Sequence, residues 1–315
     1  MTNNLPTPTE ALKIGTRGSP LALAQAYETR ERLSKAFDLP FEAFEIVVIK
    51  TTGDRVLDRP LKDIGGKGLF TREIEESLLR GDIDIAVHSM KDMPVDQPDG
   101  LTLDTYLPRE DVRDAFISPR SAGLADLAEG AVVGTSSLRR RAQLLYKRPD
   151  LQVVEFRGNM QTRLKKLDDG VAEATFLAMA GLNRMKISNV PTYSIEVDDM
   201  LPAVAQGAIG IERRAADIMV TDMLAAIHDC PTGQRLMVER AFLSALDGSC
   251  ETPIAGLAEL DGLNLRFRGE VLRPDGSESI SDDVTVSIGD GADAGIAMAK
   301  KLLAEAGDGF FNWRL

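Results

Sequence analysis

Short apolar segments alternate with amphipathic helical ones along the first part of the chain. The expected strands cover residues 12–16, 44–50 and 83–89, and the expected helices cover 20–33 and 69–81. Pro20 stands at a typical helix start and Gly81 at a typical helix end. Because strands and helices alternate, the pattern predicts right-handed crossovers and a largely parallel sheet that binds ligands at the carboxyl ends of its strands.

A second round of the same kind begins near Asp111. The expected strands cover 114–118, 131–135, 151–156 and 174–178, and the expected helices begin at Ser137 or Leu138 and near Asn159. Residues 203–214 contain too many small side chains for an ordinary helix. We expect this segment to return the chain to the first unit, which would make the first domain discontinuous.

The last third of the chain changes character. Two helical stretches are expected at 215–229 and 233–248, and a final helix at about 292–306. Between them, residues 254–288 alternate with period two around Asp261-Gly262 and Asp275-Gly276, which is typical of antiparallel hairpins. The element order therefore predicts an α/β fold followed by a small α+β domain.

Composition narrows the classes of protein that fit this pattern. The 315 residues allow two or three domains, and the net charge of −12 argues against binding nucleic acid or an anionic membrane through the whole surface. Two cysteines cannot form a disulfide framework or a four-thiolate metal site, so we expect no metal and a reducing, cytoplasmic compartment. The first 13 residues resemble neither a signal nor an anchor, and we expect no membrane-spanning segment.

One segment departs from the acidic balance. Residues 134–166 hold nine basic and two acidic side chains, a local charge of +7. Arg139 and Arg140 follow the hydroxyls of Thr135 and Ser137 at a strand-to-helix turn. Since guanidinium groups bind carboxylates bidentately, the segment predicts a ligand with several carboxylates or phosphates. A solvated helix face is the alternative, and nucleic acid is disfavoured because no aromatic platform flanks the segment.

Two more strand ends carry polar side chains suited to a site. Arg17 and Ser19 lie at the first strand-to-helix turn, and His88, Lys91 and Asp92 follow the strand at 83–89. An Asp92 carboxylate among cations would stay ionised, and it could then stabilise a cationic intermediate or relay a proton. A capping or turn role for Asp92 is the alternative.

The loop cysteine Cys250 also has two interpretations. It follows a helix and a glycine and precedes Pro253, whereas Cys230 lies at a helix end. An isolated cysteine commonly behaves as a small hydrophobe, and a hydrolase pair of Cys250 with His88 lacks any local signature. The glycine-rich residues 65–68 lack the full spacing of a phosphate-binding loop, so we expect a flexible lid there.

Several motifs together resemble one enzyme family, porphobilinogen deaminase, also called hydroxymethylbilane synthase. They are GTRGSPLALAQA, KTTGDRVLDRPL, GGKGLF, DIAVHSMKDMP, GTSSLRR, RGNMQTRL, LAMAGLNR, AVAQGAIGIE and ERAFLSALDGSCETPIAG, within about residues 12–260. The resemblance implies a transferase that joins four porphobilinogen molecules head to tail into hydroxymethylbilane and releases ammonia, in tetrapyrrole and haem biosynthesis. A non-catalytic small-anion-binding protein of a two-lobed binding-protein fold is the alternative.

The resemblance also implies a fold and an assembly state. Two α/β domains similar to periplasmic binding proteins would be hinged together, with a small α+β domain at the carboxyl end. The implied boundaries are 11–106 with 205–225, then 107–204, then 226–315. We expect a monomer whose partner is the small-molecule substrate, with no nucleic acid and no membrane.

The family's site residues carry over by motif. A dipyrromethane cofactor would be bound as a thioether to Cys250, Asp92 would be the catalytic carboxylate, and Lys67 would lie in the lid. Ser249 departs from the usual Gly-Gly-Cys of the family, and we expect it to be compatible. The implied cofactor- and substrate-binding residues are Arg17, Ser19, Lys91, Thr135, Ser137, Arg139, Arg140, Arg157, Arg163, Arg184 and Gln206.

Overall fold

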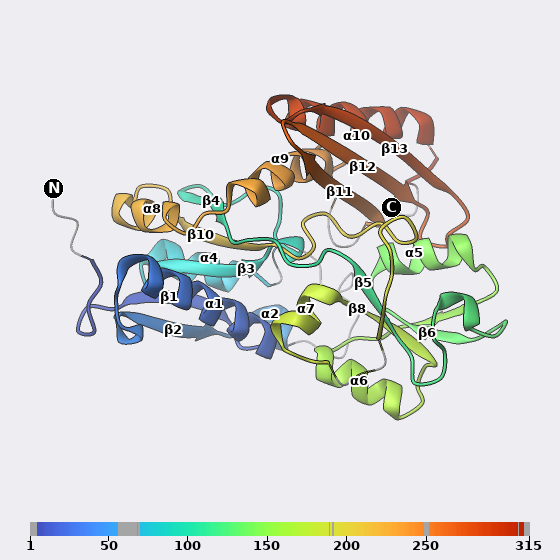
Figure 1. Ribbon diagram of the computed structural model, residues 1–315, viewed down its shortest axis with the longest axis horizontal. Helices are drawn as coiled ribbons and strands as arrows, with labels where there is room; N and C mark the ends of the chain where they lie inside the picture. Colours follow the sequence, from blue (N-terminus) through green and yellow to red (C-terminus); the bar gives the residue numbers. More distant parts are fainter. Residues whose placement is uncertain are drawn as a thin grey trace. The chain divides into compact units, whose positions relative to one another are not determined.

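The computed structural model describes residues 5–55, 68, 70–188, 190, 192–248, 252–307 and 309–311. Lys67, Ser249 and Cys250 lie outside these residues, and so do the expectations that concern them. The chain forms two compact units, residues 1–109 with 208–233 and residues 110–207 with 234–315 (Figure 1). The expected three-domain boundaries stay a prediction.

A five-stranded sheet forms the centre of the first unit, in the order β2-β1-β3-β10-β4. Its strands are β1 (Leu12–Arg17), β2 (Phe44–Ile49), β3 (Ile85–Ser89), β4 (Leu101–Tyr106) and β10 (Ile209–Arg214). Strand β1 is parallel to β2 and β3, whereas β10 is antiparallel to both β3 and β4. The sheet is therefore mixed rather than largely parallel, because β10 comes from a distant part of the chain instead of a crossover helix.

Helices cover both faces of this sheet. Helices α1 (Pro20–Phe37) and α8 (Ile218–Ala225) contribute to one apolar cluster on the sheet and α4 (Arg72–Arg80) to another. The unit also contains α2 (Thr52–Arg55) and the short 3-10 helices η1 (Phe41–Ala43) and η2 (Met90–Asp92). Side chains of β3 alternate between two apolar clusters: Val87 packs in the cluster that contains Leu33 of α1, and Ala86 in the cluster that contains Leu78 of α4. By this alternation His88 falls on the face of α4.

The second unit contains another mixed five-stranded sheet, in the order β7-β6-β8-β5-β9. Its strands are β5 (Asp114–Ile117), β6 (Val132–Gly134), β7 (Gln152–Val154), β8 (Ala174–Ala178) and β9 (Thr192–Ser194). Its helices are α5 (Leu138–Lys147), α6 (Met160–Asp168), α7 (Met179–Arg184) and η3 (Leu124–Asp126). Ser137 and Asn159 cap α5 and α6, which confirms the helix starts expected from the sequence.

An antiparallel sheet of β11 (Ile254–Asp261), β12 (Asn264–Leu272) and β13 (Ser279–Ser287) completes the second unit. Helix α10 (Gly291–Ala306) packs along this sheet (Figure 1). The other helical elements in this part of the chain are α9 (Cys230–Ala245) and η4 (Ile288–Asp290). Both hairpins occur where the alternation placed them, and the α/β class with a carboxyl-terminal α+β part is confirmed. Within the residues that the structure describes, no helix is long and apolar enough to span a bilayer.

Candidate functional site

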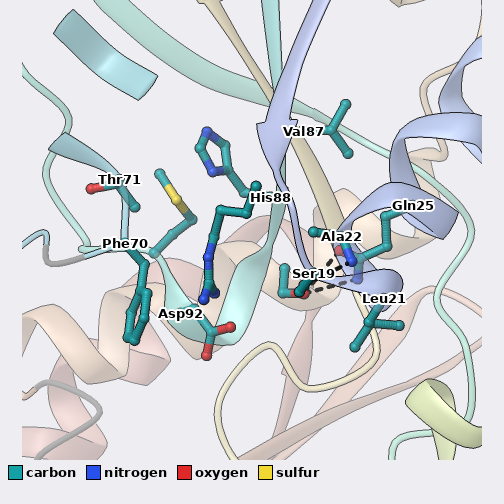
Figure 2. Close-up of a pocket in the computed structure, with 12 residues that line it drawn as sticks. Ser19, Leu21, Ala22, Gln25, Phe70, Thr71, Val87, His88 and Asp92 are labelled. Carbon is teal, nitrogen blue, oxygen red and sulfur yellow. Dashed lines mark hydrogen bonds between the residues drawn. The ribbon is translucent and has the colours of Figure 1, made fainter. Parts of the chain in front are cut away.

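A small pocket of about 70 Å³ lies at the carboxyl edge of the first sheet (Figure 2). Parallel strands β1 and β3 end at the same edge, which brings their following residues together although they are far apart in sequence. The pocket is lined by Arg17, Ser19, Leu21, Ala22, Gln25, Phe70, Thr71, Val87, His88, Ser89, Asp92 and Met93. Three residues expected to act together, Arg17, Ser19 and Asp92, therefore share one pocket.

Local structure sets how these side chains are presented. The Ser19 hydroxyl caps α1 by accepting from the Ala22 backbone N–H at 3.3 Å. The Arg17 guanidinium lies over the Phe70 ring, 4.1 Å from its centre, and keeps its charge at the pocket wall. Asp92 ends η2 and is exposed to the pocket. A carboxylate, a fixed guanidinium and a capped helix start can bind acidic groups and stabilise a neighbouring cation.

Sequence reasoning missed other parts of this wall. Gln25 donates to the Ser89 hydroxyl at 2.8 Å, and the Phe70 ring stacks with Arg17. Nothing in the local sequence marks Phe70 or Gln25, because each reaches the pocket only through the packing of its helix or loop. Lys91, half-buried in η2, does not line the pocket.

Several of the predicted binding residues lie at the carboxyl edge of the second sheet. Thr135 follows β6 and is buried, and its hydroxyl accepts from the Ser137 backbone N–H at 3.2 Å. Arg157 follows β7, which is parallel to β6, so Arg157 and Thr135 belong to the same edge. In the described part of the chain, Nη1 of Arg157 is buried without a hydrogen-bond partner. A buried cationic donor without a hydrogen-bond partner is suited to binding an acidic ligand.

Arg139 and Arg140 are instead directed into the protein. Both are 4% exposed, and both bind the carboxylate of Asp114, with Arg139 Nη2 to Oδ2 and Arg140 Nη2 to Oδ1 each 2.7 Å. Gln206 Nε2 donates to the same Oδ1 at 2.9 Å. Three residues predicted to bind substrate thus converge on a buried acid, and their substrate-binding role stays a prediction.

The electrostatics of Asp114 follow from this arrangement. Burial by itself raises the pKa of a carboxyl, but the two guanidinium charges and the hydrogen bonds from Arg140 and Gln206 outweigh it and hold the pKa of Asp114 well below its usual range. Sequence reasoning missed Asp114, since a single acid at the start of a strand carries no local signal. The run of arginines was the indirect sign that a buried counter-charge was needed.

The two remaining arginines are held by backbone carbonyls. Arg163 Nε donates to the Gly158 carbonyl at 2.9 Å, and Arg184 Nη2 donates to the Gly207 carbonyl at 3.0 Å. Both side chains are half-buried, so each is positioned by the protein while part of it stays accessible.

Comparisons with known proteins agree with these features. Residues 12–222 match a family profile described as "Porphobilinogen deaminase, dipyromethane cofactor binding domain", and residues 234–304 match "Porphobilinogen deaminase, C-terminal domain". Porphobilinogen deaminase of Paracoccus denitrificans is 64% identical over 98% of this chain and 99% of its own. The chloroplastic enzyme of Pisum sativum is 54% identical over 96% of this chain and 84% of its own.

Solved structures that match part of the chain include the periplasmic aliphatic sulphonate binding protein of Escherichia coli. It is 14% identical, with a TM-score of 0.41 over 76% of this chain and 71% of that one. The periplasmic VFT2 domain of a Bordetella pertussis protein has a TM-score of 0.40 at 14% identity, over 69% of this chain and 86% of that one.

Proposed function

This chain belongs to the porphobilinogen deaminase family, and from that premise we propose how its residues carry out the reaction. The enzyme joins four porphobilinogen molecules head to tail, giving hydroxymethylbilane and ammonia in tetrapyrrole biosynthesis. Porphobilinogen carries an acetate and a propionate, so each addition brings two more carboxylates to the site. The residues of the chain must therefore bind several carboxylates, stabilise one cationic intermediate and assist the transfer of one proton.

The donor set of the chain fits a dipyrromethane cofactor. That group carries four carboxylates, and Nη1 of Arg157 is a buried cationic donor with no hydrogen-bond partner among the described residues. When bound, the dipyrromethane supplies the pyrrole carbon to which the next unit is joined. We propose Cys250 as its attachment point, because a thiolate adds readily to an electrophilic methylene and leaves a stable thioether.

Asp92 is the proposed catalytic carboxylate. It is exposed in the pocket, where it can accept hydrogen bonds from pyrrole N–H groups. As ammonia leaves porphobilinogen a positive charge spreads over the pyrrole ring, and a fixed carboxylate stabilises that charge. Asp92 can also assist the proton transfers that accompany coupling.

The remaining polar residues are proposed to bind the acidic side chains. Arg157 has the best-supported role, because its Nη1 has no partner among the described residues. Arg139 and Arg140 already bind Asp114, so we propose that they add positive potential to the carboxyl edge of the second sheet. Lid contacts by Lys67 belong to the same proposal. The other proposed binding residues are Arg17, Ser19, Lys91, Thr135, Ser137, Arg163, Arg184 and Gln206.

One observation carries the proposal: Arg17, Ser19 and Asp92, which lie in two separate family motifs, line one pocket. Intact-protein mass spectrometry on enzyme from a porphobilinogen-producing host tests it. We expect a covalent addition of two pyrrole units on the wild type and on Cys230→Ser, and none on Cys250→Ser. Addition that survives in Cys250→Ser would remove that residue from its role.

Asp92→Asn tests the catalytic assignment separately. The variant should keep the covalent primer and fail to extend it, because the carboxylate that stabilises the cation is gone. Near-normal formation of hydroxymethylbilane by this variant would contradict the assignment.

The cellular location and the oligomeric state of the enzyme are proposals as well. The low cysteine content favours a reducing compartment, and we propose a cytoplasmic location. We also propose that the enzyme acts as a monomer, which light scattering at working concentration tests directly. The alternative of a non-catalytic anion-binding protein is not favoured by the family match.

A further inference from the structure

A histidine and a glutamate form a buried pair beside the pocket. His88 Nε2 lies 3.2 Å from Glu212 Oε2, and the two side chains are 5% and 0% exposed. His88 also lines the pocket that holds Asp92 (Figure 2). An ionised carboxylate only accepts hydrogen bonds, so Nε2 carries the hydrogen in this contact. The pair thus keeps a proton in the wall of the pocket.

Burying this pair is costly, and packing alone gives no reason for it. Oε1 of Glu212 is buried and has no hydrogen-bond partner within the described ranges. A second acid, Glu75 of α4, is also buried, and its pKa is raised by burial and by the charge of Glu212. Two buried acids thus lie within electrostatic reach of one histidine, where apolar side chains would pack at lower cost.

Sheet geometry connects the pair to the catalytic loop. In the register of β3 with β10, His88 lies opposite Gly210, and Glu212 lies opposite the next residue on the same face of β3, Ala86. A Cβ at Gly210 would lie 2.1 Å from Sδ of Met90, so the glycine makes room for η2 to close against β10. Met90 and Asp92 both belong to η2. The His88–Glu212 contact therefore fixes the strand end from which Asp92 projects.

We propose that His88, held by Glu212, is a positioning residue: its hydrogen bond occupies the Glu212 carboxylate and fixes the strand end from which Asp92 projects. This inference rests on the proposed function. In each addition the C–N bond of protonated porphobilinogen breaks with its electron pair leaving on ammonia, and the pyrrole carbon of the chain forms the new C–C bond. That carbon then loses its hydrogen as a proton, which converts ammonia to ammonium.

One positive charge is thus present near Asp92 throughout the addition, as ammonium, ring cation or released proton. Without the hydrogen bond from His88, the Glu212 carboxylate would be a second buried acceptor beside the pocket and would compete with Asp92 for that charge. Among the described residues, the charged and titratable groups that line the pocket or interact electrostatically with the pair are Glu75 from α4, Glu212 from β10, Arg17 from β1 and Asp92 from η2.

The experiment compares three variants of the holoenzyme. His88→Asn and Glu212→Gln remove the proton-holding group and the charge of its partner. The chain has two histidines, and His228→Asn is the matched control. Its Nδ1 accepts from the Tyr106 backbone N–H at 3.2 Å, and it does not line the pocket. Steady-state kcat and KM for porphobilinogen are measured between about pH 5.5 and 9, where histidine titrates.

We expect both test variants to keep the covalent primer and a KM near that of the wild type. Their kcat should fall about tenfold, less than the 10²–10⁴-fold cost of losing a group that transfers the proton itself. Their pH profile should also change in shape, whereas His228→Asn should match the wild type. An unchanged kcat and pH profile in His88→Asn or Glu212→Gln would overturn the proposal.

A second measurement covers the case in which a variant does not fold. Proton NMR of the wild type shows two imidazole signals, and His228→Asn assigns the one from His88. A His88 titration that coincides with a limb of the kcat profile supports the proposal, and a titration unrelated to it overturns the proposal. If the wild type itself makes no hydroxymethylbilane, the assigned activity fails and this inference fails with it.

Discussion

Replacing Asp114 by asparagine removes the carboxylate around which two buried arginines close. Arg139 and Arg140 together direct three N–H donors to it, at 2.7, 2.7 and 3.2 Å. Removing one partner of a buried ion pair costs about 3–5 kcal/mol, because the remaining charge stays in a poorly solvated place. Each guanidinium keeps a backbone carbonyl, that of Leu201 or Phe176, which does not replace the lost charge. We expect Asp114→Asn to destabilise the second unit by about 3–5 kcal/mol.

The same carboxylate predicts an acid-dependent loss of stability. Its pKa in the folded protein lies below the unfolded value near 3.8, because the guanidinium charges outweigh burial. The unfolded chain therefore binds the proton of Asp114 more tightly than the folded protein does. The stability that the ionised carboxylate provides is complete above the unfolded pKa and is lost as the pH falls below it. Wild-type stability should decline from about pH 4 downward, and Asp114→Asn should show less of this decline.

Hydrogen exchange in increasing urea, followed by mass spectrometry of peptides, measures the stability of each unit separately. Peptides from β5 and α5 should lose protection at lower urea in Asp114→Asn, whereas peptides from the first unit should not change. The matched control is Asp199→Asn, whose side chain is 61% exposed and pairs with Lys147, and its effect should stay within about 0.5 kcal/mol.

A triple variant separates the loss of the pair from the loss of packing. If the cost comes from stranded guanidinium charges, Asp114→Leu combined with Arg139→Met and Arg140→Met should recover much of the stability lost in Asp114→Asn. A loss below about 1 kcal/mol in Asp114→Asn, or a triple variant no more stable than the single one, would refute this reasoning.

Three further predictions concern other positions. Arg157→Leu should weaken retention of enzyme-bound intermediates about tenfold or more, seen in their mass distribution, because a charge-assisted contact is lost. Gly134→Ala should cost about 1–3 kcal/mol in urea denaturation, since a Cβ there would lie 2.4 Å from the Phe156 ring. Glu75→Gln should reduce the loss of stability as the pH rises above about 4.5, because burial, and then the charge of Glu212, raises the pKa of Glu75 in the folded protein.

Each of these has a control and a contradicting result. Arg120→Leu, exposed in the same unit, should leave the intermediates unchanged, and equal behaviour of Arg157→Leu would remove the binding role. Gly289→Ala, where a Cβ meets nothing closer than 3.8 Å, should be nearly neutral, and an equal cost at both glycines would reject the steric argument. Glu31→Gln, exposed on α1 of the same unit, should leave the pH dependence as it is, and an unchanged slope in Glu75→Gln would contradict the burial argument.

The sequence by itself determined the element types, the class of fold and the candidate chemistry at strand ends. Period-two alternation with Asp-Gly turns predicted β11 to β13, and the capping residues Ser137 and Asn159 predicted where α5 and α6 begin. These features are local, because turn conformation and helix capping depend on residues close together in the chain. For the same reason the motifs around Arg17, Ser19 and Asp92 could be assigned to strand ends.

Only the tertiary structure decided which charged side chains face one another. Arg139 and Arg157 look alike in the sequence, yet Arg139 binds Asp114 in the interior, whereas no hydrogen bond to Nη1 of Arg157 is found among the described residues. Likewise, the pairing of His88 with Glu212 requires residues 124 positions apart to meet on adjacent strands. Electrostatic partners depend on distance and burial in three dimensions, and sequence spacing records neither.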